Sequence, residues 1–125
     1  MLSTKEKGDI ALSQAISWYI RSGHEVLLPV GDRKDYDCVV EKDGVLKKVQ
    51  VKYAGKYADG VCRVGLRITG GNQSRNYTKK YVDDAFDLLF IYTEKGTLFE
   101  IPWKHFPYKN ELTIEDKKYI KYRLI

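Results

Sequence analysis

The first twenty residues place apolar side chains at the spacing of a helix with one buried face. Ser3-Thr4-Lys5-Glu6 has the form of a capping box, in which two side chains satisfy amides at the start of a helix. The apolar positions that follow recur every three or four residues and are Ala11, Leu12, Ala15, Ile16, Tyr19 and Ile20. Gly23 can adopt the left-handed conformation without a steric penalty, so we predict that this amphipathic helix ends there.

Runs rich in β-branched and aromatic residues then predict several strands. Residues 24–30 form the first run, and the polar segment 31–35 has the composition of a turn. Two further runs, 36–41 and 45–52, are joined by Lys42-Asp43-Gly44, and Asp-Gly is a strong signal for a tight reversal. We therefore predict a β-hairpin about this turn.

Beyond the hairpin, the pattern predicts a strand, a loop and a short helix. Residues 61–68 alternate apolar side chains with basic or small ones, which predicts a strand with one buried face. Residues 69–76 are polar and contain glycine, as is typical of a loop. Residues 78–85 favour a short helix that Thr78 would cap.

The last third of the chain is predicted to hold two paired strands and a final helix. Residues 86–92 are nearly all apolar, as in a strand that is covered on both faces, and Gly96 turns the chain into 97–101. From Thr113 we expect a helix, with lysines outward and three apolar residues inward, namely Ile114, Tyr119 and Ile120. This order of elements predicts an α/β fold, a mixed β-sheet flanked by α-helices.

Composition narrows the class of protein. The chain has 125 residues, 43% of them hydrophobic, which fits one compact domain over residues 1–125. We expect a cytoplasmic location and no membrane span, because the apolar runs are far shorter than the ~20 residues required and no secretory signal is visible. Cys38 and Cys62 lack zinc-ligand partners and are expected in the core. The net charge of +5 favours a polyanionic partner.

Candidate chemistry gathers at the ends of the hairpin strands. Counting back from the Asp-Gly turn places Asp37 opposite Gln50, within about one residue of register. Gln50 and Lys52 share one face of their strand because side chains alternate. A carboxylate, an amide oxygen and the Val51 carbonyl are the hard oxygen ligands that Mg²⁺ prefers, and a nearby lysine can activate water or counter charge on a phosphate. The alternative, a turn aspartate beside two solvated strand residues, stays open, because the D-x(12)-Q-x-K pattern is degenerate.

Several ordered landmarks resemble the PD-(D/E)XK endonuclease superfamily, and most of all its bacterial homing endonucleases encoded in group I introns. The landmarks lie within residues 5–103: Lys7-Gly8-Asp9-Ile10, Val26-Leu27-Leu28-Pro29-Val30-Gly31, Tyr36-Asp37, Val49-Gln50-Val51-Lys52, Asn76-Tyr77-Thr78, Val82-Asp83 and the strand 87–92. The resemblance implies a restriction-endonuclease-like core, Mg²⁺-dependent cleavage of double-stranded DNA, and a homo-oligomer, a dimer or tetramer. It makes Asp37 the metal-binding aspartate, Gln50 the replacement of the usual acid, and Lys52 the motif lysine.

One departure from the family bears on activity. Relatives tend to carry a glutamate on the first helix four residues after the glycine, and this chain has Leu12 there. Glu6 or Asp9 could substitute if the helix is rotated, and loss of the acid lowers metal affinity. Leu12 and the neutral Gln50 leave a catalytically inactive DNA-binding module open as an alternative. A Holliday-junction-resolving nuclease on the same fold, which would recognise DNA shape, is a further alternative.

Basic and polar side chains follow the predicted site over the next three elements and suggest a DNA-binding surface. Arginine and lysine contact phosphates and base edges, and the interleaved Asn and Gln residues add hydrogen bonds. The basic residues are Lys56, Arg63, Arg67, Arg75, Lys79 and Lys80. The alternative is a solvated sheet face.

Overall fold

The computed structural model describes residues 1–31, 33–71, 76–80, 85–105 and 110–125, and it describes 67–71, 76–80 and 105 by their backbone alone. In chain order its elements are α1 (Thr4–Arg21), β1 (Glu25–Leu27), β2 (Cys38–Lys42), β3 (Val45–Lys56), β4 (Cys62–Gly65), β5 (Arg67–Gly71), β6 (Asn76–Lys80), β7 (Leu88–Thr93), β8 (Leu98–Pro102), η1 (Trp103–His105), β9 (Glu111–Thr113) and η2 (Lys117–Tyr122).

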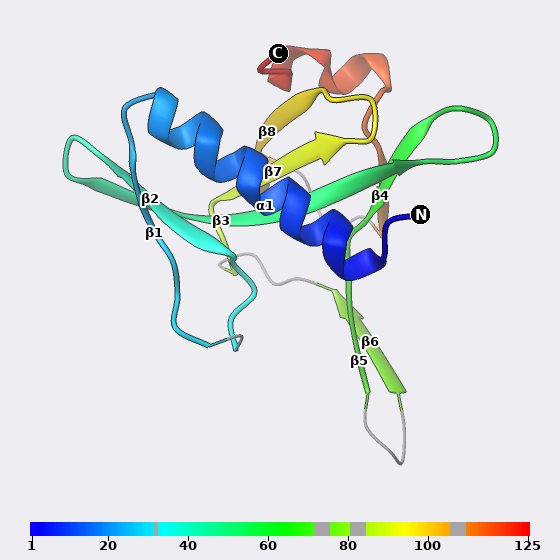
Figure 1. The fold of residues 1–125 in the computed structure, drawn as a ribbon, viewed down its shortest axis with the longest axis horizontal. Coiled ribbons are helices and arrows are strands. Elements are labelled where there is room, and N and C mark those ends of the chain that lie inside the picture. Colours follow the sequence, from blue (N-terminus) through cyan, green and yellow to red (C-terminus); the bar gives the residue numbers. More distant parts are fainter. Residues whose placement is uncertain (32, 72–75, 81–84, 106–109) are drawn as a thin grey trace.

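A seven-stranded sheet is built around the long strand β3. The order β1-β2-β3-β4-β9 is antiparallel throughout, whereas β7 pairs with β3 in parallel and with β8 antiparallel. The predicted mixed sheet and the predicted pairing of 86–92 with 97–101 are thus confirmed. Strands β5 and β6 form a separate two-stranded hairpin that projects from the sheet (Figure 1).

Helix α1 lies across one face of the sheet (Figure 1). The predicted capping box is present, since Ser3 Oγ accepts from the Glu6 amide and Glu6 Oε1 accepts from the Ser3 amide. The predicted apolar stripe is buried at Ala11, Ala15 and Tyr19. The predicted burial is wrong at the last turn of the helix, where Ile20 is 58% exposed.

A hydrophobic core covers each face of the sheet. Leu88 and Phe90 of β7 pack beneath α1. Leu89 and Ile91 point to the opposite face, into a second core that includes Trp103. The nearly unbroken apolar run of β7 therefore reflects burial on both faces, as predicted. Both cysteines are buried thiols, also as predicted.

The prediction of several flanking helices is wrong, because α1 is the one α-helix in the described residues. Residues 78–80 belong to strand β6, where Thr78 pairs with Thr69 of the segment expected to be a loop. This β-rich sequence gains a ladder of hydrogen bonds with β5, which outweighs the helix cap that Thr78 could offer. Residues 81–84, the rest of the predicted helix, lie outside the described residues.

Two further boundaries differ from the predictions. The first strand ends at Leu27, since Pro29 has no amide hydrogen for a sheet ladder and β1 pairs with β2 no further than Leu27 opposite Val39. The tail forms the short 3-10 helix η2, because the chain must return to β8, where Leu124 N donates to Leu98 O at 2.7 Å. In that shorter helix Ile120 is 68% exposed instead of buried.

Candidate active site

The β2–β3 hairpin brings Asp37 beside Gln50, as the sequence predicts. Asp43 and Gly44 both have positive φ, 53° and 81°, which is the backbone of the tight turn that Asp-Gly favours. The ladder from this turn ends with Cys38 opposite Val49. The Asp37 amide then donates to Val49 O at 2.8 Å, so Asp37 lies one residue beyond the last pair.

Strand β3 has a break in its pairing at this point. On one side it pairs with β7 from Val49 to Ala54. On the other side its pairing with β2 ends at Val49 and its pairing with β4 begins at Gly55, so the described strands leave a gap between these two residues of β3. The carboxylate of Asp37 enters this gap, where its Oδ2 accepts a hydrogen bond from Val51 N at 2.8 Å. The amide and carbonyl of one strand residue face the same side, so the Val51 carbonyl also faces the gap.

Gln50 and Lys52 lie on the face of β3 opposite α1, because Val49 and Val51 pack in the core beneath the helix. Gln50 is 8% exposed, and Lys52 is half-buried. Burial lowers the pKa of the Lys52 ammonium, and the negative charge of Asp37 partly opposes that shift. Lys52 is therefore an amine whose proton is held less firmly than that of a solvated lysine and that senses the Asp37 carboxylate.

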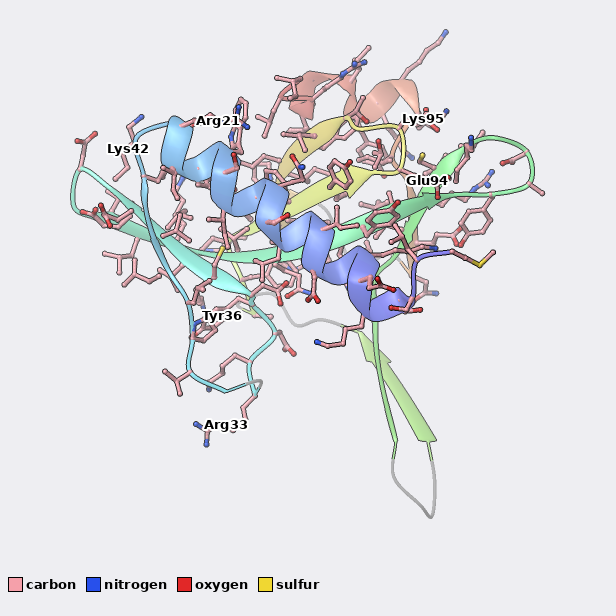
Figure 2. The ribbon with its side chains drawn as sticks, in the orientation of Figure 1. Arg21, Arg33, Tyr36, Lys42, Glu94 and Lys95 are labelled. Atoms are coloured by element: carbon pink, nitrogen blue, oxygen red, sulfur yellow. The ribbon has the colours of Figure 1, made fainter. Side chains whose placement is uncertain are left out.

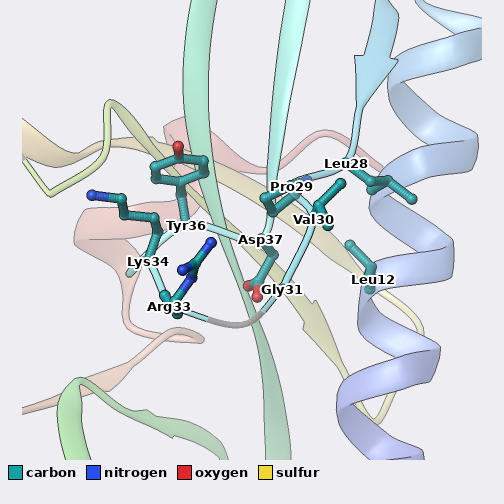
Figure 3. A pocket seen from close by; sticks show the side chains of 9 residues that line it. All are labelled: Leu12, Leu28, Pro29, Val30, Gly31, Arg33, Lys34, Tyr36 and Asp37. Carbon is teal, nitrogen blue, oxygen red and sulfur yellow. The ribbon is translucent and has the colours of Figure 1, made fainter.

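Leu12 and Asp37 line the same cavity, which has a volume of about 600 Å³. Figure 3 shows the Leu12 side chain extending from α1 toward this space and the Asp37 carboxylate entering it from the start of β2. Leu12 is half-buried; it packs against the core beneath α1 and also lines this cavity. Its side chain stands where an acid on the helix would face Asp37, in agreement with the departure noted in the sequence.

Neither alternative acid replaces a glutamate at position 12. Glu6 is exposed and its Oε1 is bound to the Ser3 amide in the capping box. Asp9 is exposed and does not line the cavity. Among the described residues, no group of three or more His, Cys, Asp or Glu side chains could hold a metal ion. The candidate oxygen donors along this stretch of β3 are thus the Asp37 carboxylate, the Gln50 amide and the Val51 carbonyl.

This donor set fits Mg²⁺ in one of its common binding modes. Mg²⁺ retains several waters and is often bound by one or two carboxylates together with the phosphates of a substrate. With Asp37 as its single carboxylate, the site is suited to a metal that arrives with a phosphate and poorly suited to one that binds alone.

The predicted DNA-binding residues do not form one surface. Arg63 faces the side of the sheet that carries α1, whereas Lys56 points to the other side, as its pairing opposite the buried Cys62 indicates. Arg63 also forms a two-point ion pair with Asp59, at 2.7 and 3.1 Å, which lowers the pKa of Asp59 to about 2. Of the remaining predicted positions, Arg67, Lys79 and Lys80 lie on the projecting hairpin.

On that hairpin the structure describes the backbone of β5 and β6. Arg67 pairs with Lys80, and Lys79 pairs with Ile68, so three predicted basic positions share one two-stranded ribbon. Arg75 lies outside the described residues.

Two cations beside the site were missed by the sequence analysis. Arg33 and Lys34 line the cavity that holds Asp37. Figure 2 places Arg33 on the connection between β1 and β2, which projects from the sheet on the same side as the β5–β6 hairpin. In the sequence these two basic residues stand four and three positions before Asp37. They were interpreted only as part of the turn predicted for residues 31–35.

The sequence and the fold of this chain were compared with those of known proteins. The sequence pattern of the PD-(D/E)XK endonuclease family matches residues 2–123. A solved structure of a bacterial homing endonuclease, I-Ssp6803I, is similar with a TM-score of 0.83 and 31% identity, covering 98% of this chain and 89% of that one. Among curated protein sequences none gives a match. No helix in the described residues is long and apolar enough to cross a bilayer.

These similarities span nearly the whole chain, so they include the β2–β3 hairpin with Asp37, Gln50 and Lys52 as well as α1 with Leu12. The chain belongs to the PD-(D/E)XK endonuclease family.

Proposed function

We propose that the protein is a Mg²⁺-dependent endonuclease that cuts double-stranded DNA at specific sites. The observation that carries the proposal is the gap along β3, where the Asp37 carboxylate is fixed by the Val51 amide at 2.8 Å beside Gln50 and Lys52. A phosphate that enters this gap would meet an anionic oxygen for a metal, an amide oxygen and an ammonium group in one place.

Each residue has a distinct role in this proposal. Asp37, the Gln50 amide oxygen and the Val51 carbonyl would hold Mg²⁺, which polarises the phosphate and lowers the pKa of a bound water. Lys52 would hold its ammonium against the charge that grows on the phosphate oxygens, and its lowered pKa eases proton exchange with the attacking water. Asp37 would keep that ammonium protonated between turnovers.

Sequence-specific cutting by an assembly follows from size and symmetry. A subunit of 125 residues contacts few base pairs, whereas a symmetric dimer or tetramer reads two related half-sites and presents an active site to each strand. Similarity to a bacterial homing endonuclease supports this mode over recognition of DNA shape, the property expected of a junction-resolving enzyme.

A catalytically inactive DNA-binding module is the second candidate. Leu12 favours it, because an apolar side chain faces Asp37 across the cavity and the site has one carboxylate. The two functions differ in one assay, the cutting of DNA in the presence of Mg²⁺ or Mn²⁺.

Asp37→Asn tests the proposal with little disturbance of the fold. Asparagine retains an oxygen that can accept the Val51 amide and loses the charge that a metal requires. We expect the wild type to nick and linearise supercoiled plasmid DNA with Mg²⁺ or Mn²⁺, and Asp37→Asn to lose at least 100-fold in rate, an effect of about 3 kcal/mol, while binding duplex DNA nearly as tightly.

Asp43→Asn is the matched control, because it removes the same charge at the hairpin turn, where Asn-Gly is equally suitable. Its cutting rate should equal that of the wild type. Unchanged cutting by Asp37→Asn would eliminate the proposed site. A wild type that binds DNA in a salt-dependent way and never cuts it would instead support the binding module.

A further inference from the structure

A second cavity lies next to the candidate active site, between the start of α1 and the strands β3 and β4, and has a volume of about 480 Å³. We propose that it holds a backbone phosphate of the bound DNA strand, next to the phosphate that is cut, with Lys7 and Arg63 as its cations. This inference rests on the proposed function and adds to it a specific place for the DNA backbone.

Basic side chains line the cavity, and Asp59, the ion-pair partner of Arg63, is not part of its lining. Its lining includes Lys7, Lys52 and Arg63, and no Asp or Glu is among the described residues that line it. Lys7 Nζ lies 5.8 Å from the centre of the Tyr53 ring, and the Arg63 guanidinium lies 5.1 Å from that of Tyr57, so each cation lies over an aromatic ring that also lines the cavity.

This charge comes from side chains and does not depend on the helix end. At the start of α1, the Ser3 and Glu6 side chains already satisfy amides through the capping box. The features that distinguish the cavity are therefore its two cations, Lys7 and Arg63, and the glycines in its wall.

Glycines make the wall of the cavity open to a bulky ligand. Gly8, Gly55 and Gly65 line it, and a Cβ added at any of them would meet no atom within 4 Å. None of the three has positive φ, so their conformations do not require glycine. Side chains could stand at these positions, and their absence leaves space where a nucleic acid backbone can approach β3 and β4 closely.

The cavity is adjacent to the candidate active site along two elements. Gly8 lines it and Leu12 lines the cavity of Asp37, and these residues are one turn apart on α1, about 6 Å along the axis. Val51 lines it too, and its amide is bound to Asp37. A DNA strand, which carries a phosphate at every nucleotide, is long enough to occupy both cavities, whereas a single small anion is not.

Binding of a fluorescein-labelled 30-base-pair duplex of random sequence, measured by anisotropy in EDTA over a range of salt concentrations, tests the inference. Lys7→Gln should weaken binding about fivefold at low salt and lower the slope of log K against log salt by about 0.9, the value for one phosphate contact. Lys5→Gln is the matched control, because Lys5 is exposed on the same helix turn and does not line the cavity.

Gly65→Val tests whether the open space beside Gly65 is needed for DNA binding. A valine on strand β4 should leave the melting temperature equal or higher, since its Cβ enters open space and β-branched residues suit strands. The same variant should lose about tenfold in affinity, because the side chain occupies the place of the backbone phosphate.

If Lys7→Gln and Gly65→Val both bind the duplex as the wild type does, with the same salt slope, the subsite is wrong and the proposed function is untouched. A wild type with no affinity for the duplex would overturn both. Stabilisation of the wild type by inorganic phosphate, absent in Lys7→Gln and accompanied by unchanged DNA binding, would identify a free-anion site and also overturn the inference.

Discussion

Replacing Leu12 by glutamate should turn a site that needs its substrate to hold Mg²⁺ into one that binds the metal alone. Leu12 faces Asp37 across the cavity of about 600 Å³, so the new carboxylate would stand opposite the existing one (Figure 3). Two carboxylates on one ion raise affinity, because hard cations depend strongly on ligand charge. Leu12→Gln is the matched control, since it has the same shape as the glutamate and no charge.

The expected changes in the free energy of unfolding follow from the burial of Leu12 and from the added charge. Removing a half-buried leucine side chain costs about 1 kcal/mol in both variants. In Leu12→Glu, repulsion between the two carboxylates adds about 3 kcal/mol for an assumed separation of about 6 Å and an effective dielectric constant of about 20, and less where water enters the cavity. If the pair binds Mg²⁺ with a dissociation constant of about 0.1–1 mM, 10 mM metal contributes about 1.4–2.7 kcal/mol.

Thermal unfolding with and without 10 mM Mg²⁺ measures this difference without requiring cleavage. At about 4 °C per kcal/mol for a chain of this size, Mg²⁺ should raise the melting temperature of Leu12→Glu by about 5–10 °C. The wild type and Leu12→Gln should change by no more than about 2 °C. Equal responses of all three proteins to Mg²⁺ would refute the view that position 12 faces the metal site.

Two further predictions use charges around the site. Burial lowers the pKa of Lys52 from its ordinary 10.5, so the folded protein releases this proton at a lower pH than the unfolded chain does. The stability of the wild type therefore rises as the pH approaches 10.5. In urea titrations in EDTA, Lys52→Met should thus be more stable than the wild type at pH 7, by a margin that shrinks toward pH 10; a constant margin would contradict this. Asp59→Asn removes the partner of Arg63 and should raise affinity for duplex DNA two- to fivefold at low salt, and anisotropy showing weaker binding would argue against it.

The sequence predicts those parts of the site that depend on local signals. The Asp-Gly turn sets the hairpin register, and the register alone brings Asp37 to Gln50. The capping box likewise fixes the start of α1. These features depend on interactions between residues close together in the chain, so they can be predicted from the sequence.

Other parts depend on contacts between distant residues and could not be read in this way. The parallel pairing of β3 with β7 joins segments about 40 residues apart. Thr78 has the residue type of a helix cap, yet pairing with β5 makes it part of a strand. The position of Leu12 opposite Asp37 results from the packing of α1 on the sheet, and helical spacing alone gave the leucine only a place on the apolar stripe.

At the gap along β3, Asp37 has a structural role in addition to the metal-binding role proposed for it. An unpaired strand edge leaves backbone groups without partners, and a buried amide without one costs about 1–3 kcal/mol. Asp37 supplies that partner to Val51 and carries the charge a metal would need. Asp37→Ala would therefore lose stability and metal binding together, whereas Asp37→Asn keeps the hydrogen bond and removes only the charge. A fall in cutting that appears equally in both variants, with unfolding confined to the alanine variant, would assign the effect to the charge.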